Sequence, residues 1–482
     1  MGKSMNYYKI RNIPTVIRTS IYMKNRKFRL SLKILILFLS ISSVFNVFCQ
    51  KSDSISHYSS IVKSHIYQDY KGMYREGGGS LVYPFLTPGS NQYDNVLWDW
   101  DSWLSNIALR QILSDIGSSK DKEEAIRYEQ GCVLNFLHYG DWDGYLPIVI
   151  WEDSKPRDIR PENIYDVNMH KPVLAQHAAF ITRENGGDAG WLREKFYHLQ
   201  AFVNNYKNHH RHKPTGLYYW QSDVAIGVDN DPATFYRPDK SSASIYLNCL
   251  MYKELLAMVY LADQLNLSEI GKEFIADADA LKKAIQEHCW DERDGFFYSA
   301  DLNLRSLENR EDNTLGRTFL IHSGYPRDYD CLIQRIGVWS GFLAMWAGIA
   351  TPGQAERIVN EHYSNPGTFN SPSGVRTLSK MEKMYSMRAS ANPSNWRGPI
   401  WGVSNYMVFR GLVNYGYTGE ARELAIKTVM LFGKDFEKNS ALHEYYEPET
   451  GEPILNKGFQ NWNYLVLNMI AWLEGNEVVM EY

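Results

Sequence analysis

Residues 241–288 decide the fold, and they read SSASIYLNCLMYKELLAMVYLADQLNLSEIGKEFIADADALKKAIQEH. Apolar residues recur in this stretch at the three- and four-residue spacing of a helix face, which predicts helices over residues 241–264 and 267–288. Because only a tight turn around Leu267 and Ser268 separates them, we expect the two helices to form a hairpin.

The same periodicity recurs along the chain and predicts twelve helices in all. The other ten are expected over residues 52–70, 101–116, 121–138, 169–183, 188–209, 331–348, 352–362, 400–415, 418–437 and 459–474. Tight turns join some helices, whereas residues 139–168, 210–240, 289–330, 363–399 and 438–458 form long connections rich in Trp, Asp, Gly and Pro. Loops longer than about 15 residues are uncommon unless they are functional. The sequence therefore predicts an all-α (α/α)6 barrel, with six inner and six outer helices and long loops that roof the active-site end.

The composition fits one large globular domain. The 482 residues are 44% hydrophobic, 14% aromatic and 22% charged, which excludes a disordered chain, and no apolar run is long enough for a protein that crosses a membrane several times. No linker or low-complexity tract interrupts residues 50–482, which are expected to form a single catalytic domain. Its four cysteines are widely spaced, without the CxxC pairs of a zinc site: Cys132, Cys249, Cys289 and Cys331.

Residues 1–49 have the pattern of a secretory signal peptide. They contain nine Lys and Arg and no Asp or Glu, and the apolar stretch ILILFLSISSVFNVF runs from Ile34 to Phe48. This stretch is short and interrupted by Ser, so an uncleaved membrane anchor is the weaker alternative. If translation starts at Met23 instead of Met1, a complete basic region still precedes the apolar stretch. We therefore expect a secreted or periplasmic protein, without any membrane partner beyond the signal.

Loss of this segment makes the protein strongly acidic. Its nine positive charges leave with it, so the formal net charge changes from −4 to −13. An acidic surface repels phosphate backbones, and the sequence therefore excludes nucleic acid as a partner.

A cluster of tryptophans and carboxylates marks the start of the second helix, where residues 98–103 read WDWDSW. Indole rings stack on the apolar faces of sugars, and a carboxylate accepts hydrogen bonds from two hydroxyls. Trp98, Trp100 and Asp101 are therefore candidates for sugar binding. The alternative is that Asp101 or Ser102 only caps the helix.

The loop over residues 219–232, YWQSDVAIGVDNDP, offers a candidate acid. Hydrolysis of a glycosidic bond needs a protonated carboxyl at the leaving oxygen, and burial or like charge raises the pKa of a carboxyl. Asp229 fits this role, because Asp223 and Asp231 are close in sequence and Trp220 supplies an apolar wall. A calcium loop is the alternative, but the spacing of the twelve-residue calcium motif is missing, and we expect no metal.

Residues 395–401 read NWRGPIW and lead into another inner helix. Arg397 can donate a two-pronged set of hydrogen bonds to sugar hydroxyls or to a substrate carboxylate, with Trp396 and Trp401 beside it. The alternative is a structural helix start in which Arg397 forms a salt bridge.

The loop before the last helix supplies a second carboxylate, since residues 443–452 read HEYYEPETGE. Glu444 is the best candidate for a base that polarises water, and Tyr445 follows it. The other glutamates of this loop are expected to be solvated: Glu447, Glu449 and Glu452.

In this order the four segments resemble glycoside hydrolase family 63. This family contains α-glucosidases and mannosylglycerate or glucosylglycerate hydrolases and is related to the family 37 trehalases. The segments that carry the resemblance are WDS at 100–102, GVDNDP at 227–232, WRGPIW at 396–401 and the loop that begins at Glu444. The chain departs from the family where Asp231 replaces a usual Ser and where residues 458–462 follow a G-F-S segment only loosely. These departures affect substrate identity most.

The resemblance implies an inverting hydrolase of an α-linked glucoside or mannoside, either a small oligosaccharide or a glycosylglycerate. Asp229 would be the general acid and Glu444 the general base, with their carboxyls about 6.5–9.5 Å apart to leave room for a water. No cofactor is expected. The expected substrate-binding residues are Trp98, Trp100, Asp101, Gln176, Trp220, Trp396, Arg397, Trp401 and Tyr445. An acidic aglycone would need a cation, and the roofing loops contain Arg237, Lys240, Lys380 and Arg388.

Two other functions stay open. A sugar epimerase or isomerase on the same barrel would use histidines as proton shuttles, and His170, His177 and His443 are available. A non-catalytic sugar-binding protein would need only the tryptophans, although two carboxylates in different loops favour an enzyme.

Overall fold

The computed structural model describes residues 53–89, 92–304, 309–312, 316–322 and 327–482. The chain divides into two compact units, residues 1–57 and 58–482. In the first unit the described residues 53–57 are helical. The expected signal peptide and its boundary at residue 49 lie outside the described residues.

The second unit is mainly helical. Its helices comprise residues 58–69, α2 (Asp99–Ile116), α3 (Ser119–His138), α4 (Pro156–Ile159), α5 (Leu174–Glu184), α6 (Phe196–His209), α7 (Ile245–Gln264), α8 (Ser268–His288), α9 (Leu343–Trp346), α10 (Pro352–Arg357), α11 (Gly402–Asn414), α12 (Thr418–Asn439) and α13 (Val466–Glu474). Short turns of other helix types extend them or stand between them: η1 (Tyr70–Met73), η2 (Gly190–Leu192), η3 (Trp339–Phe342), η4 (Ile358–Tyr363) and η5 (Asn461–Leu465). Apart from the single turn α4, each helix corresponds to one of the twelve predicted.

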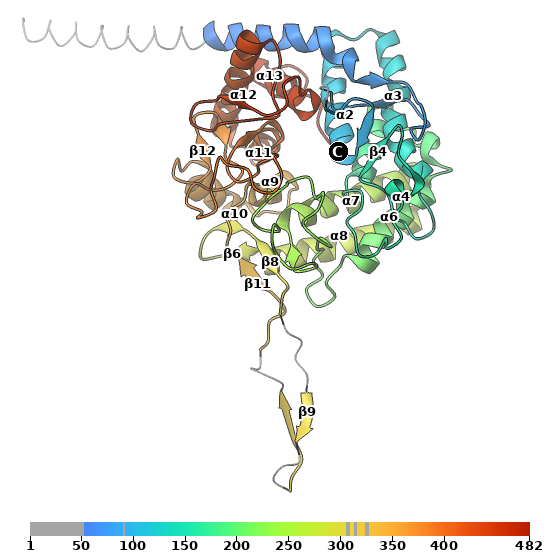
Figure 1. Ribbon diagram of the computed structural model, residues 1–482, viewed down its shortest axis with the longest axis vertical. Helices are drawn as coiled ribbons and strands as arrows, with labels where there is room; N and C mark the ends of the chain where they lie inside the picture. Colours follow the sequence, from blue (N-terminus) through green and yellow to red (C-terminus); the bar gives the residue numbers. More distant parts are fainter. Residues whose placement is uncertain (1–52, 90–91, 305–308, 313–315, 323–326) are drawn as a thin grey trace, which may run out of the picture. The chain divides into compact units, whose positions relative to one another are not determined.

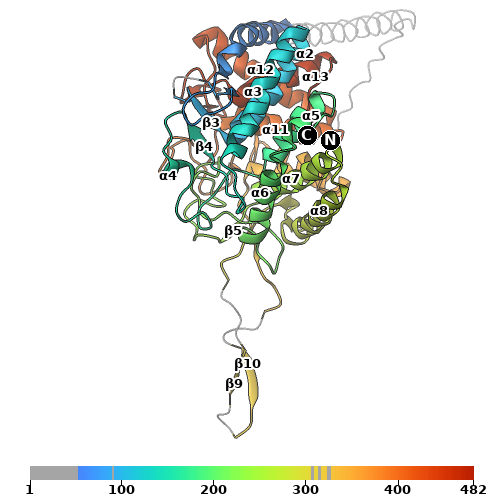
Figure 2. The ribbon, with the colours of Figure 1, turned by 90° about the vertical axis from the view of Figure 1, so that its right-hand side faces the viewer.

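Six of these helices close a ring within the second unit. Around it α2 contacts α5, α5 contacts α7, α7 contacts α9, α9 contacts α11, α11 contacts α13, and α13 returns to α2 (Figure 1). The helices of the ring are buried on nearly all faces, whereas their hairpin partners α3, α6, α8, α10 and α12 expose one side; Figure 2 shows α3, α6 and α8 on the outside. The predicted (α/α)6 barrel is confirmed.

The inner helix α7 is apolar all round because it is surrounded by protein. Among the described helices it is the one long and apolar enough to cross a membrane, but 78% of its apolar window is buried inside the barrel. A helix without a polar face is what an inner position in a large core requires.

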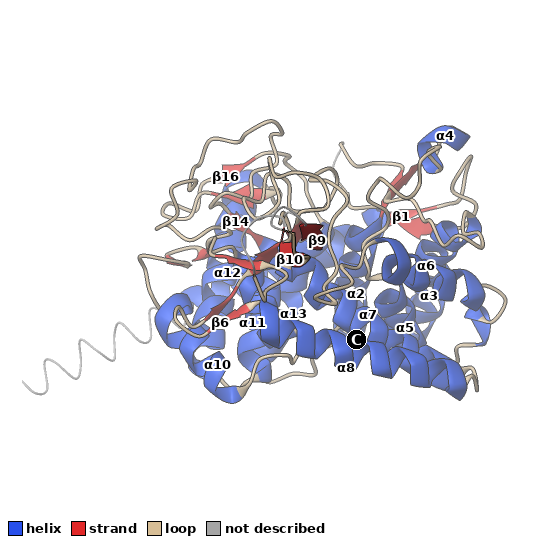
Figure 3. Cartoon of the chain, turned by 90° about the horizontal axis from the view of Figure 1, so that it is seen from below, coloured by secondary structure: helices blue, strands red, loops and turns tan. Residues whose placement is uncertain are grey.

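The connections from outer to inner helices are long, and those from inner to outer helices are short. The long loops therefore lead into the N-terminal ends of the inner helices, and several of the short strands lie among these loops (Figure 3). Sequence reasoning found five of these loops; residues 70–98 form another. Its omission matters because Tyr93 and Trp98 lie on it.

The strands form small antiparallel sheets within the loops. They are β1 (Tyr74–Arg75), β2 (Phe85–Leu86), β3 (Val96–Trp98), β4 (Val149–Trp151), β5 (Ser242–Ala243), β6 (Trp290–Asp291), β7 (Phe296–Phe297), β8 (Ser299–Asp301), β9 (Asn309–Asp312), β10 (Phe319–His322), β11 (Leu332–Gln334), β12 (Asn370–Ser371), β13 (Gly374–Val375), β14 (Ile400–Trp401), β15 (Tyr445–Tyr446) and β16 (Pro453–Ile454). The sheet β14–β15–β16 pairs Trp401 with Tyr445, so it joins two of the sequence motifs.

Two inner helices are shorter than predicted. The helix expected over 169–183 begins only at Leu174, and the N–H groups of His170 and Lys171 before it donate to the Leu146 carbonyl and to the carboxylate of Asp99. In the segment expected to be helical over 331–348, β11 pairs with β8 first, and the helical turns begin with η3 at Trp339. At both places the residues before the helix bond to other loops.

Candidate active site

A cavity of about 680 Å³ lies among the long loops at the N-terminal ends of the inner helices. Its volume is in the range of small-molecule sites. The described residues that line it come from the segments before or at the starts of α2, α5, α7, α11 and α13: Gln92, Tyr93, Trp98, Trp100, Asp101, Trp151, Lys171, Val224, Ala225, Gly227, Asp229, Ala391, Asn392, Pro393, Ser394, Trp401, Glu444, Leu455, Asn456, Phe459 and Trp462. Both predicted catalytic carboxyls, Asp229 and Glu444, are among them.

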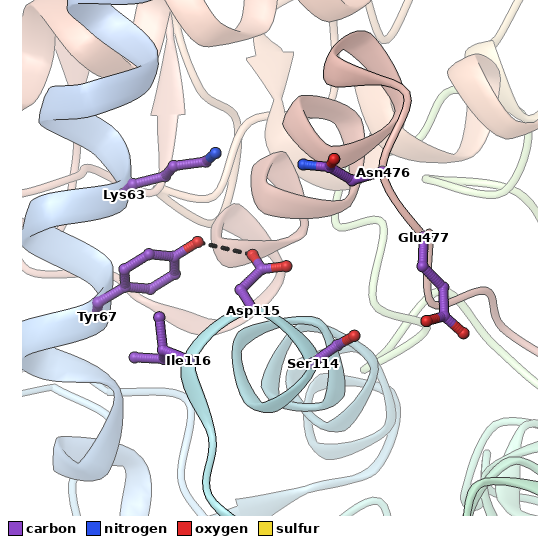
Figure 4. Close-up of a pocket in the computed structure, with 7 residues that line it drawn as sticks. All are labelled: Lys63, Tyr67, Ser114, Asp115, Ile116, Asn476 and Glu477. Atoms are coloured by element: carbon purple, nitrogen blue, oxygen red, sulfur yellow. Dashed lines mark hydrogen bonds between the residues drawn. The ribbon is translucent and has the colours of Figure 1, made fainter.

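A smaller cavity of about 400 Å³ lies at the C-terminal ends of α2 and α13, away from the long loops (Figure 4). It is lined by Lys63, Tyr67, Ser114, Asp115, Ile116, Asn476 and Glu477. The Tyr67 hydroxyl donates to Asp115 at 2.7 Å, and Lys63 pairs with Glu474 at 2.6 Å. Its polar groups thus bond to one another, and its lining includes none of the sequence motifs. The larger cavity is therefore the candidate active site.

The turn before Asp229 packs closely against Lys171. Gly227 has a φ of 89°, and a Cβ at this position would lie 2.5 Å from Lys171 Cε. After Asp229, the side chain of Asn230 accepts a hydrogen bond from the Trp396 backbone N–H at 3.0 Å and donates to the Ser394 carbonyl at 2.7 Å. These contacts fix the loop of the candidate acid to the segment that contains the WRGPIW motif.

Asp229 is partly buried in the cavity wall, and Asn392 Nδ2 donates to its Oδ2 at 3.1 Å. Burial raises the pKa of Asp229, while Lys171 and hydrogen bonds from Ser394 and Asn392 act in the opposite direction.

The neighbouring acids of this loop have partners elsewhere. Asp223 accepts a hydrogen bond from the Tyr236 backbone at 3.1 Å, and Asp231 Oδ1 accepts one from Ala233 at 2.8 Å. The raised pKa of Asp229 therefore comes from burial and not from the like-charge repulsion that the sequence suggested. The described residues contain no group of three or more His, Cys, Asp or Glu side chains placed to hold a metal ion.

Glu444 is the residue directly before β15, and it lines the cavity. Its backbone N–H donates to the Leu455 carbonyl at 3.1 Å, which fixes its position against the following turn. Asn456 Nδ2 donates to Oε2, and the Tyr93 hydroxyl donates to Oε1 at 3.4 Å. Burial raises the pKa of Glu444 to about 7, and the charge of Asp229 adds to this rise. The two carboxyls therefore share one cavity, and the charge of Asp229 affects the titration of Glu444.

Asp101 lines the same cavity, in the first turn of α2. Asn461 Nδ2 donates to its Oδ1 at 2.5 Å, and burial raises the pKa of Asp101 to about 7. Lys171 Nζ lies 2.9 and 3.0 Å from the two oxygens of Asp99. This ion pair is almost fully buried and joins the start of α2 to the segment before α5.

Some of the predicted aromatic residues line the cavity, and the others are buried behind it. Trp98, Trp100 and Trp401 line the cavity. Trp396 lies behind the wall and stacks on Trp401, with ring centroids 4.1 Å apart and planes 12° apart, and it is fully buried. Trp220 is also buried, beside Tyr246 in the core.

Three more predicted substrate-binding residues do not reach the cavity. Gln176 is fully buried and donates to the carbonyls of Pro172 and Leu250, which joins α5 to α7. Arg397 donates to the Arg388 carbonyl. The Tyr445 hydroxyl donates to the Pro393 carbonyl at 2.7 Å. The structure gives these residues, with Trp396 and Trp220, a role in positioning the wall.

Sequence reasoning missed several residues of the site. Lys171 follows directly after His170, which was considered only as a proton shuttle, and Trp462 lies in a segment noted for its divergence. Tyr93 and Asn456 had no motif of their own and are recognisable only because both donate to Glu444. Asn392 lies in a long loop without any distinguishing pattern.

The histidines proposed for an epimerase lie outside the cavity. His170 and His177 are buried in the core, where burial lowers their pKa values to about 4 and about 3. His443 Nδ1 is bound to Asp435. The described cavity lining contains no histidine, and this weighs against a histidine-based proton shuttle.

Residues 93–463 match the family described as the mannosylglycerate hydrolase MGH1-like glycoside hydrolase domain. The chain belongs to this family. The matched range begins at Tyr93 and contains both Asp229 and Glu444. As a member of the family 63 type, the chain is a glycoside hydrolase.

Relatives of this MGH1-like hydrolase carry several sugar-hydrolase names. Mannosylglycerate hydrolase MGH1 of Selaginella moellendorffii is 22% identical, over 78% of this chain and 80% of that protein. A probable trehalase of Eremothecium gossypii is 28% identical over 43% of this chain, which matches only 26% of the trehalase. The GH63 mannosylglycerate hydrolase from Thermus thermophilus, crystallised with Tris and D-glycerate, shares the fold with a TM-score of 0.59 at 20% identity, over 84% of this chain and 99% of that chain.

Proposed function

We propose that this glycoside hydrolase cleaves an α-linked glucoside or mannoside of small size with inversion of the anomeric centre. The observation that carries the proposal is the pair of buried carboxyls, Asp229 and Glu444, which come from distant loops and line one cavity walled by tryptophans. Sugar binding alone needs no such pair. An inverting hydrolase needs one carboxyl to protonate the leaving oxygen and another to activate water on the opposite face.

Burial raises the pKa of both carboxyls, that of Glu444 to about 7. Both oxygens of Glu444 accept hydrogen bonds, from Asn456 and from Tyr93, which favour the ionised form that a base needs. The resemblance of the GVDNDP segment and of the Glu444 loop to family 63 assigns the roles: Asp229 donates the proton to the leaving oxygen, and Glu444 takes a proton from the attacking water.

The α-configuration and the small size of the substrate follow from two considerations. The relatives are named as hydrolases of mannosylglycerate and as trehalases, whose substrates are small glycosides. A cavity of about 680 Å³ accommodates a ligand of that size. Trp98, Trp100 and Trp401 offer the ring faces against which a pyranose stacks.

A product-resolved screen tests this function. The enzyme is incubated with trehalose, kojibiose, nigerose, mannosylglycerate and glucosylglycerate, and with reducing monosaccharides. Release of a monosaccharide from at least one α-glycoside, lost in Asp229→Asn, is the expected result. A change in epimer ratio without hydrolysis would support an epimerase instead, and binding without any product would support a sugar-binding protein.

We further propose that the protein is exported. The supporting observation is the basic and then apolar pattern of residues 1–49. Expression of the full chain followed by fractionation and N-terminal sequencing tests it. A mature chain that begins near residue 50 outside the cytoplasm is expected, and a cytoplasmic protein with an intact N-terminus would contradict it.

A further inference from the structure

The ionisable side chains of the cavity are mostly acidic. Asp101, Asp229 and Glu444 carry carboxyls, and Lys171 is the one Lys or Arg among the described residues that line it. The Lys171 side chain is only 2% exposed, and it pairs with both oxygens of Asp99, whose side chain is fully buried. Its charge is therefore neutralised on the protein side, and the described lining offers a ligand no free cation.

The loop segments that line the cavity beside Asp229 contain no other charged side chain among the described residues, and Lys171, which packs against Gly227 and lowers the pKa of Asp229, is paired with Asp99. A general acid protonates the leaving oxygen, so the aglycone must lie next to Asp229. The loops beside it contribute small, apolar, amide and hydroxyl side chains to the cavity: Val224, Ala225, Ala391, Asn392, Pro393 and Ser394. Amides and hydroxyls are suitable partners for alcohol groups.

Three of the four cations that the sequence offered as receptors for an acidic aglycone are bound to other acids, and the fourth, Arg388, does not line the cavity. The three form the pairs Arg237–Asp301, Lys240–Asp166 and Lys380–Glu449, at 2.6, 2.6 and 2.8 Å. Arg397, predicted to bind a substrate carboxylate, donates to the carbonyl of Arg388 instead. None of these cations lines the cavity.

We propose that the leaving group of the substrate is an uncharged polyol or sugar, and that the enzyme selects against the carboxylate of glycosylglycerates. The inference rests on the proposed function, because it places the aglycone beside Asp229. With Asp229 protonated for catalysis, a carboxylate there would meet the negative charge of the ionised Glu444 without a free cation among the described lining residues to compensate it. Since the cavity is partly closed to solvent, salt screens this repulsion less than on an open surface.

A matched pair of substrates isolates the charge. Glucosylglycerol and glucosylglycerate differ by a hydroxymethyl group in place of a carboxylate, and the mannosyl pair differs in the same way. We expect kcat/KM to be at least about tenfold higher for the glycerol compound of the preferred sugar, because the site offers the carboxylate only repulsion. An equal or higher kcat/KM for the glycerate compound would overturn the inference.

Failure of the inference and failure of the proposed function give different results. If the enzyme cleaves neither pair nor any 4-nitrophenyl α-glycoside, the hydrolysis proposal fails. Calorimetric titration of the wild-type enzyme with the same four compounds then decides the charge inference by itself. Tighter binding of the glycerol compounds supports it, and equal or tighter binding of the glycerate compounds overturns it.

A positive charge introduced into the cavity lining tests whether electrostatic repulsion causes the preference for an uncharged leaving group. Val224 lines the cavity, and its side chain is 66% exposed, so a longer residue fits there. Val224→Lys is expected to raise the ratio of kcat/KM for glycerate compound to glycerol compound several-fold, whereas Val224→Met, of similar length, leaves this ratio unchanged. An equal ratio in both variants would contradict the electrostatic cause.

Discussion

Lys171, which lines the cavity, forms a buried ion pair with Asp99. Lys171 Nζ lies 2.9 Å from Oδ1 and 3.0 Å from Oδ2, and the Lys171 backbone N–H donates to Oδ2 at 2.9 Å. The pair joins the first residue of α2 to the segment before α5, and Gly227 packs on Lys171 from the loop that carries Asp229. The Lys171–Asp99 pair therefore connects the start of α2, the segment before α5 and the loop that carries Asp229.

Removal of the cation is expected to destabilise the fold. Lys171→Met leaves the Asp99 carboxylate buried without a counter-charge, and breaking a buried pair from one side costs roughly 3–5 kcal/mol. Urea unfolding measures this loss of stability. The control is Lys272→Met, which removes an exposed partner of Glu269 and should cost less than about 1 kcal/mol. Similar losses of stability in both variants would show that the buried Lys171–Asp99 pair contributes no more to the free energy of unfolding than an exposed pair.

The two candidate catalytic carboxyls are expected to be individually essential. Asp229→Asn removes the proton donor and Glu444→Gln removes the base, so each should lower kcat by about 10²–10⁴-fold while sugar binding persists. Steady-state kinetics measures the first effect, and calorimetric titration measures the second.

Matched controls exist in the same loops. Asp223 bonds to the backbone of Tyr236, and Glu452 pairs with Lys438 at the surface. Asp223→Asn and Glu452→Gln should therefore leave kcat within about threefold of wild type, since surface changes are usually small. Substantial activity in Asp229→Asn or Glu444→Gln would reject the assignment of roles.

The activity is expected to fall as the pH rises above about 7. The pair must hold one proton between its two carboxyls, because the acid is protonated when the base is ionised. Burial raises the pKa of Glu444 to about 7 and also raises that of Asp229, so the last proton of the pair leaves near pH 7. At low pH both carboxyls are protonated and the base is lost. The pH profile of kcat/KM should thus be bell-shaped, with its alkaline limb near neutrality.

Tyr93→Phe tests whether Glu444 sets the position of the alkaline limb of the pH profile. The Tyr93 hydroxyl donates to Glu444 and lowers its pKa, so loss of the hydroxyl should move the alkaline limb to higher pH. The contact at 3.4 Å is long, which implies a small shift. A limb that moves to lower pH would show that Glu444 does not govern it.

Asp101 is expected to bind the sugar and not to transfer a proton. Hydrogen bonds to a charged acceptor contribute about 1.5–3 kcal/mol, so Asp101→Asn should lower kcat/KM roughly 10–100-fold. The pH dependence should keep its shape, because the Asp229–Glu444 pair is intact. Asp141→Asn, an exposed carboxylate outside the cavity, is the control. Loss of the alkaline limb in Asp101→Asn would assign it a role in proton transfer.

Much of the barrel was predictable because helical periodicity depends on local sequence. The hairpin of α7 and α8 shows this well, since both helices start within four residues of their predicted starts. The start of α5 was not predictable, because the segment before it bonds to Leu146 and Asp99, which are distant in sequence.

The candidate site shows the same limit. Asp229 and Glu444 could be found from motifs, and both lie in the cavity. Motifs did not distinguish residues that line the cavity from those behind it: Trp401 lines it, whereas Trp396, in the same motif, stacks on its hidden face. Partners such as Tyr93 and Asn456 depend on the three-dimensional arrangement of loops and had no sequence signal.

Asp229 and Glu444 are proposed to act from opposite sides of one sugar, and the anomeric form of the first product tests this most directly. Proton NMR follows the monosaccharide released from an α-glycoside before mutarotation. We predict that the β-anomer appears first, because water activated by Glu444 attacks the face opposite the leaving group. Initial release of the α-anomer would mean retention and would contradict the proposed roles of both carboxyls.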